Sequence, residues 1–133
     1  MVIDTNVLVS GLLSPYAASG EVVRMLVAGT IQPCLDARLI CEYADVLNRP
    51  RFKFPPDAVG DLLEYFRHTG IFAAGSPLPS PLPDSDDEPF LEVALGAGAE
   101  YLITWNTKHF PPRIRKVEVL TPGLFLKKLR RQG

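Results

Sequence analysis

Near its start the chain contains the stretch Val2-Ile3-Asp4-Thr5-Asn6-Val7-Leu8-Val9-Ser10, and the prediction of its fold begins there. It is almost continuously apolar and rich in β-branched residues, so residues 2–9 are predicted to form a buried strand. Three polar residues interrupt that strand, and Asp4 is the only charged one. An aspartate inside an apolar strand costs several kcal/mol unless it is paired or metal-bound. We therefore expect Asp4 to have a functional role.

Strand and helix patterns alternate along the rest of the chain. Further strands are predicted over residues 31–35, 101–104 and 117–120. Helical spacing of apolar residues predicts helices from Val22 to Gly29, from Asp36 to Arg49, from Pro55 to Gly70, from Asp87 to Gly98 and over about residues 122–131. This alternation predicts a single α/β domain over residues 1–133, with a mostly parallel central sheet flanked by helices on both faces.

A proline-rich segment divides the two halves of this pattern. Residues 76–83 alternate prolines with small residues, which excludes a regular helix or a central strand. We expect an extended surface connection that delivers an acidic cluster to the start of the next helix. The members of that cluster are Asp84, Asp86, Asp87 and Glu88.

The net charge of −1 conceals a division along the chain. Residues 101–133 contain eight Lys and Arg against one Glu, so the first 100 residues carry a net charge of −8 and the remainder +7. An acidic body with a basic C-terminal third suits a protein that gathers carboxylates at one place and attracts a polyanion at another. A solvated basic helix end explains the C-terminal charge equally well.

Cysteine content and hydropathy bear on the cellular compartment. Cys34 and Cys41 are too few for a zinc site and are interpreted as buried thiols in a reducing cytoplasm. No apolar run approaches the roughly 20 residues needed to cross a bilayer, and no secretory signal pattern is present. The sequence thus predicts a cytoplasmic protein with no membrane association.

Polar residues stand at strand ends and helix starts that would otherwise be apolar. Asp4 interrupts the first strand, Asp87 begins the fourth predicted helix, and Asn106 follows the strand over residues 101–104. Glu42 lies on the second helix. Converging carboxylates without His or Cys partners favour Mg²⁺ or Mn²⁺ over zinc. A cation there would polarise a phosphodiester and lower the pKa of its bound water.

The opening stretch resembles the first strand motif of PIN domains, especially the VapC-type toxin nucleases and related toxin-antitoxin PIN proteins. Three further stretches match in the expected order, so the resemblance runs from Val2 to about Leu124. They are Glu42-Tyr43 with Val46-Leu47 and Arg49; Asp84-Ser85-Asp86-Asp87 with Phe90-Leu91 and Ala94; and Leu102-Ile103-Thr104-Trp105-Asn106 running into His109-Phe110.

The resemblance implies a metal-dependent endoribonuclease whose acidic residues hold one or two Mg²⁺ or Mn²⁺ ions and activate water for attack on RNA. Carried over position by position, it makes Asp4, Glu42 and Asp87 the acidic ligands. Asp84 is a further candidate ligand, and Asp86 a lesser one. The resemblance also implies the toxin half of a toxin-antitoxin pair, an antitoxin partner that occludes the site, and a homodimer.

Two polar positions are expected to support the ligands. Thr104 and Asn6 are assigned to hydrogen bonds that orient a carboxylate or a water. Asn106 departs from the pattern, because many members of the family have a fourth aspartate there. It is still counted among the catalytic candidates, since its amide oxygen can act as a ligand without charge.

Several alternatives stay open at this point. The neutral Asn106 motivates the alternative of a PIN-fold binding or regulatory module with weakened catalysis, and the carboxylate set also fits a phosphoesterase acting on DNA or small phosphate esters. Glu42 has the alternative of an ion pair with Arg38 one turn earlier. Trp105 and Phe110 are either base-stacking residues or core.

The remaining features have plainer interpretations. His68 and His109 lack the partners of a triad or a zinc site, and we assign them structural or surface roles.

Overall fold

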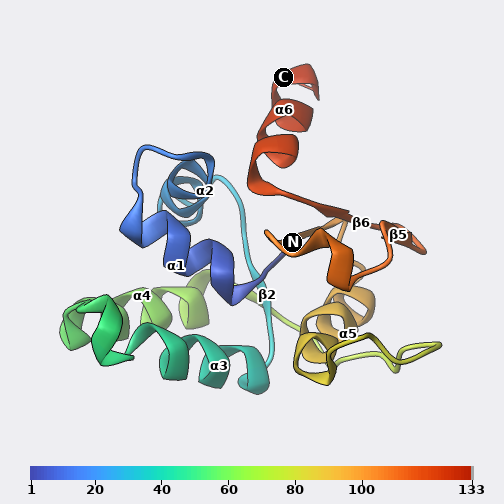
Figure 1. Ribbon diagram of the computed structural model, residues 1–133, viewed down its shortest axis with the longest axis horizontal. Coiled ribbons are helices and arrows are strands. Elements are labelled where there is room, and N and C mark those ends of the chain that lie inside the picture. The colour runs from blue at the N-terminus through green and yellow to red at the C-terminus, as the bar shows by residue number, and fades with distance from the viewer. Residues whose placement is uncertain (133) are drawn as a thin grey trace.

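The computed structural model describes residues 1–132 (Figure 1). Three short 3-10 helices, η1 to η3, interrupt the alternation of strands and helices within this range. The elements follow in the order β1 (Val2–Ile3), α1 (Thr5–Leu13), α2 (Ala18–Val27), β2 (Cys34–Leu35), α3 (Ala37–Leu47), η1 (Pro50–Phe52), α4 (Pro56–Thr69), β3 (Ile71–Phe72), η2 (Ser85–Asp87), α5 (Glu88–Ala97), β4 (Tyr101–Ile103), η3 (Thr107–His109), β5 (Arg113–Ile114), β6 (Val117–Leu120) and α6 (Pro122–Gln132).

The main sheet has the strand order β1-β4-β6-β5. Strands β1, β4 and β6 are parallel, with Leu102 opposite Val2 on one side and Val119 on the other, while β5 is antiparallel to β6. Helices α5 and α6 lie on opposite sides of this sheet in Figure 1. The predicted α/β fold with a mostly parallel sheet is confirmed.

The prediction for the opening stretch is wrong in one respect. The strand ends at Ile3, and residues 5–13 form the helix α1. Val7 and Leu8 are fully buried because α1 packs closely against α2, so close that a Cβ on Gly11 would lie 2.5 Å from a Val23 methyl carbon. Apolar residues of α1 also lie outside its buried face, as Val9 and Leu12 do, so hydrophobic periodicity does not distinguish this helix from a strand.

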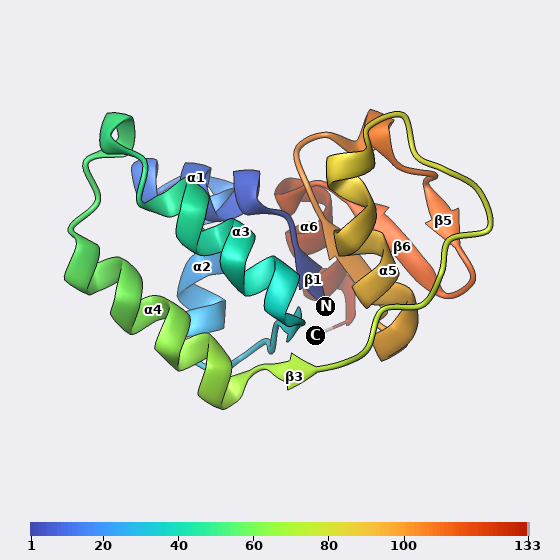
Figure 2. The same cartoon turned by 90° about the horizontal axis from the view of Figure 1, so that it is seen from below.

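The other predicted elements are present with shifted ends. The strand predicted over residues 31–35 is confined to β2, and β4 stops one residue before Thr104. The prediction of two buried thiols is correct for Cys34 in β2 and wrong for Cys41, which is exposed on α3. Strands β3 and β5 were not predicted, because strands of two residues show no alternation of apolar and polar side chains. Residues 76–83 contain neither helix nor strand, as expected, and Figure 2 shows this segment passing along the outer side of α5.

A local cap sets the start of α3, and one long-range hydrogen bond ties this helix to the main sheet. The Asp36 carboxylate caps the helix by accepting a hydrogen bond of 3.0 Å from the Leu39 N–H. The Tyr43 hydroxyl, fully buried, donates to the Ile3 carbonyl at 2.5 Å. Residue 42 is therefore held beside the carboxyl end of β1.

Within residues 1–132, no helix is both long and apolar enough to span a bilayer.

Candidate active site

A pocket of about 400 Å³ opens at the carboxyl ends of β1 and β4. Asp4 and Asn6 line it from the β1–α1 junction, Glu42 from α3, and Asp87 from the start of α5. Asn106, just after β4, completes this polar part of the lining. The structure therefore brings the three predicted acidic residues to one pocket, at the end of the parallel sheet where ligands bind in such folds.

Asp4 sits in a network of hydrogen bonds at the bottom of this site. It is only 6% exposed, and its Oδ2 accepts hydrogen bonds from the Thr104 hydroxyl at 2.7 Å and the Asn6 amide at 3.3 Å. The Thr104 oxygen in turn accepts from the Asn106 N–H at 3.0 Å, and Asn6 Oδ1 accepts from the Trp105 N–H at 3.2 Å. Asn6 and Thr104 thus hold one oxygen of the carboxylate in a fixed position.

The surroundings of Asp4 disfavour its charged form. Burial raises the pKa of the Asp4 carboxyl from 3.8 to about 6; the hydrogen bond from Thr104 opposes this rise, and the negative charge of Asp87 adds to it. Two carboxylates that face one pocket raise each other's proton affinity. A cation placed between them would offset the repulsion between the two negative charges.

Asp87 is joined to a residue for which the sequence predicted only a structural or surface role. Its side chain is 15% exposed, and its Oδ2 lies 3.1 Å from His109 Nδ1. Burial raises the pKa of Asp87 above its usual range, the hydrogen bond with His109 lowers it, and the charge of Asp84 raises it further. His109 is brought here by η3, and no local sequence pattern reports this long-range contact.

Glu42 is available at the rim of the pocket. The alternative in which it pairs with Arg38 is wrong, because the Arg38 guanidinium bonds Asp36 at 2.9 Å and Glu92 at 2.7 Å. Glu42 is exposed and makes no ion pair within residues 1–132. Its carboxylate therefore faces the pocket without a cationic partner.

Three members of the acidic cluster lie outside the pocket lining. The Glu88 carboxylate accepts a hydrogen bond of 3.0 Å from the Leu82 N–H. The Asp84 carboxylate caps η2, accepting a 2.9 Å hydrogen bond from the Asp86 N–H. Asp86 lines a neighbouring hollow that shares Glu42 with the main pocket. Asp84 thus acts on the site through its negative charge, which raises the pKa of Asp87.

The pocket also has an aromatic and cationic wall that the sequence analysis missed. Arg51 and Phe52 of η1 line it, with the guanidinium 4.8 Å from the centre of the Phe52 ring. Phe52 stacks on Phe54 at a ring-centre distance of 5.7 Å. Of the two aromatic residues after β4 that the sequence singled out, Trp105 is 43% exposed, whereas Phe110 is buried in the core.

The donor set fits a hard divalent cation held with bound water. The site offers carboxylate and amide oxygens, which Mg²⁺ and Mn²⁺ prefer. Among residues 1–132, no three His, Cys, Asp or Glu side chains are clustered so that they could hold an ion by themselves. Mg²⁺ is commonly held by one or two carboxylates, several waters and substrate phosphate, and Asp4 with Asp87 meets that requirement.

Fold and pocket together define an α/β domain with an acidic site at the carboxyl ends of its parallel strands. The family model described as the PIN domain matches residues 1–108, and the chain belongs to that family. The PIN domain is a fold of nuclease type, so the predicted family and the general class of activity agree with the structure. No curated protein and no solved structure matches this chain.

Proposed function

We propose that this PIN domain is a metal-dependent endoribonuclease of the VapC type, the toxin component of a toxin-antitoxin pair. The observation that carries the proposal is the placement of Asp4. Its carboxylate is buried, fixed by two side-chain hydrogen bonds and electrostatically opposed by Asp87. A position so costly to the folded state is typical of a group retained for binding or chemistry.

In this proposal Asp4 and Asp87 bind Mg²⁺ or Mn²⁺, and Glu42 provides a further carboxylate at the rim. The ion, when bound, supplies positive charge that polarises the phosphodiester and lowers the pKa of the attacking water. Asp4 lines the pocket, and the hydrogen bonds from Thr104 and Asn6 hold its carboxylate in place for this role. Asp87 keeps its orientation through His109.

The neutral side chains of the site position the charged ones. Thr104 and Asn6 both donate to the same oxygen of Asp4, which orients the carboxylate as hydrogen-bonded neighbours of metal ligands do. Asn106 lines the pocket and offers an amide oxygen without charge. Arg51 is the only cation among the described lining residues, and it provides attraction for a phosphate that the carboxylates repel.

The proposed toxin role brings two protein partners with it. An antitoxin would occlude the acidic pocket, and a second copy of the chain would form a homodimer. Both are proposals drawn from the likeness to VapC-type toxins. Analytical ultracentrifugation of the purified chain tests the homodimer directly.

The test of the activity is cleavage of a mixed single-stranded RNA by the purified protein. It is run with Mg²⁺, with Mn²⁺ and with EDTA, alongside Asp4→Asn prepared in the same way. We expect cutting that requires the ion and is lost in the variant. Competition with DNA and with phosphomonoesters separates a ribonuclease from a phosphoesterase with other substrates, and an inert wild type with either ion refutes the enzyme assignment.

One observation favours a second candidate, an RNA-binding module with weakened catalysis. Asn106 stands where a fourth carboxylate is expected, and the described residues contain no ready three-carboxylate cluster. The variant Asn106→Asp separates the two candidates. Under the first, cleavage is already present in the wild type; under the second, it appears only when the added carboxylate restores negative charge.

A further inference from the structure

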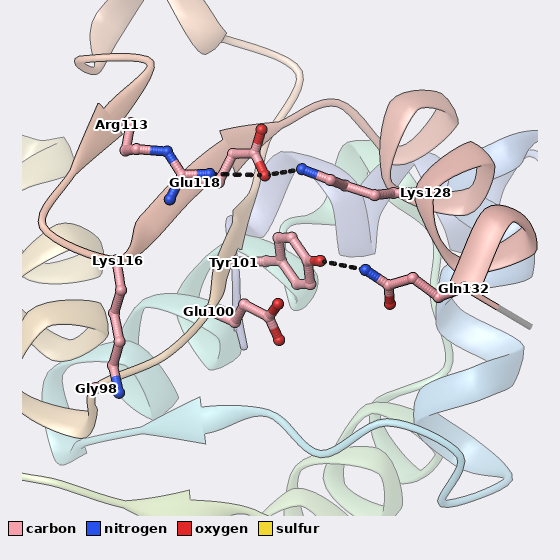
Figure 3. A pocket seen from close by; sticks show the side chains of 8 residues that line it. All are labelled: Gly98, Glu100, Tyr101, Arg113, Lys116, Glu118, Lys128 and Gln132. Carbon is pink, nitrogen blue, oxygen red and sulfur yellow. Dashed lines mark hydrogen bonds and ion pairs between the residues drawn. The ribbon is translucent and has the colours of Figure 1, made fainter.

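A second pocket, of about 460 Å³, lies at the opposite end of the main sheet from the acidic site. Figure 3 shows it between the β5–β6 hairpin, which supplies Arg113 and Lys116, and α6, which supplies Lys128. Tyr101, at the amino end of β4, is at its centre. The cations lie beyond residue 108, where the match to the family model ends, whereas Glu100 and Tyr101 lie inside the matched range.

The positive charges of this pocket are incompletely neutralised. Arg113 and Lys128 share one carboxylate, that of Glu118, with Arg113 at 3.4 Å. Lys116 makes no ion pair in the part of the chain that the structure describes. Its amine packs over Gly98, where an added Cβ would lie 3.2 Å from Lys116 Nζ. Three cations therefore face two carboxylates, of which Glu118 is already occupied.

The second carboxylate, Glu100, is exposed and carries no cationic partner within residues 1–132. It lies beside Tyr101, whose hydroxyl is 3.4 Å from the Gln132 side-chain nitrogen, and Lys128 lies 5.9 Å from the centre of the Tyr101 ring. A free carboxylate within a net positive pocket repels a bare phosphate but accepts hydrogen bonds from hydroxyls. The lining thus suits a ligand that presents phosphate and hydroxyl groups together.

We propose that this pocket binds a ribose-phosphate unit, with the phosphate on Arg113 and Lys116 and the ribose 2′-hydroxyl on Glu100. The ligand chemistry has two sources, an RNA strand and a free ribonucleotide, and we assign it to the strand. This assignment rests on the proposed function, because it makes the pocket a remote holding site for the same substrate. The 2′-hydroxyl is the group by which a protein tells RNA from DNA.

The experiment measures binding without cleavage. Anisotropy of a short labelled single-stranded RNA is recorded with the full chain in EDTA over a range of salt concentrations, and the DNA of the same sequence is measured in parallel. Arg113→Gln/Lys116→Gln is compared with Arg49→Gln/Arg67→Gln, which removes equal charge from two exposed arginines, one between α3 and η1 and one on α4. Thermal melts show that each variant folds, and Lys116→Gln alone serves as the milder variant.

We expect the pocket variant to weaken RNA binding about tenfold at low salt and to reduce the slope of log affinity against log salt by about 0.7, the value for one phosphate that is no longer neutralised on a single strand. The control variant should change affinity less than about twofold, since its arginines contact no phosphate in this scheme. Equal losses in the two variants overturn the site, because they would report net charge alone.

Glu100→Ala tests the second half of the assignment, because it removes both oxygens of this side chain. We expect it to bring the RNA and DNA affinities together, since no side-chain acceptor for the 2′-hydroxyl remains at this position. An unchanged ratio of the two affinities overturns the ribose contact. Displacement of the RNA by adenosine monophosphate at similar concentration assigns the pocket to free nucleotide instead of the strand. A protein that binds RNA here yet never cleaves it would refute the proposed enzyme activity and leave this pocket intact.

Discussion

Asp4→Asn is expected to stabilise the protein when no metal ion is present. The carboxylate is 6% exposed, and its pKa is raised from 3.8 to about 6, mainly by burial. At neutral pH the folded state must therefore hold a charge that its surroundings disfavour. An asparagine keeps an oxygen that accepts the hydrogen bonds from Thr104 and Asn6, and it carries no charge to bury.

The magnitude follows from the two pKa values. A carboxyl that binds its proton more tightly in the folded state stabilises the fold fully below pH 3.8, and this contribution is lost as the pH rises through about 6. At about 1.36 kcal/mol for each tenfold change in proton affinity, the loss is about 3 kcal/mol. The variant has no such group, so its advantage over the wild type grows from near zero at pH 3.8 to about 3 kcal/mol above pH 7.

Urea unfolding in EDTA, followed by circular dichroism between pH 4 and pH 8, measures this difference. Asp61→Asn is the control, because Asp61 is an exposed carboxylate on α4, and its substitution should change stability by less than about 0.5 kcal/mol at any pH. A variant at position 4 that is less stable than the wild type at neutral pH would refute the reasoning. So would a difference between them that does not shrink towards pH 4.

Three further predictions rest on other observations. Millimolar Mg²⁺ or Mn²⁺ should raise the melting temperature of the wild type but not of Asp4→Asn, and equal shifts would contradict the ion's placement. Tyr43→Phe should cost about 1–2 kcal/mol in chemical unfolding, because the Ile3 carbonyl loses its donor in the core. Gly60→Ala should gain about 1 kcal/mol, since nothing lies near its added Cβ, whereas Gly96→Ala should lose about 2, because its Cβ would come within 1.9 Å of a backbone oxygen.

Local sequence rules predicted the helices better than the strands. Asp36 caps α3 and Pro56 opens α4, as those residue types do in any chain. The first strand was predicted too long, because Val7 and Leu8 are buried in a helix that is apolar on most sides. In this segment hydrophobicity indicates which residues are buried, but it does not distinguish the repeat of a helix from that of a strand.

The candidate site was only partly accessible to sequence reasoning. Asp4 stands out because it is a charge in an apolar run, and that local contrast survives the change from strand to helix N-cap. The contact of His109 with Asp87 spans 22 residues, and the preference of Arg38 for Glu92 over Glu42 spans 54. Such pairings depend on how the helices meet, which spacing along the chain does not encode.

The match to the family model ends earlier in the chain than the main sheet does. The family match ends at residue 108, yet β6, which follows it, lies between β4 and β5 in the sheet. A chain cut at that residue would leave the hydrogen-bonding groups of β4 open along one edge and remove the fully buried Phe125 that packs edge-on against Tyr101. We expect such a fragment to aggregate through this open edge, so a shortened, fused or permuted form of the protein should keep β6 and α6 together with the rest of the sheet.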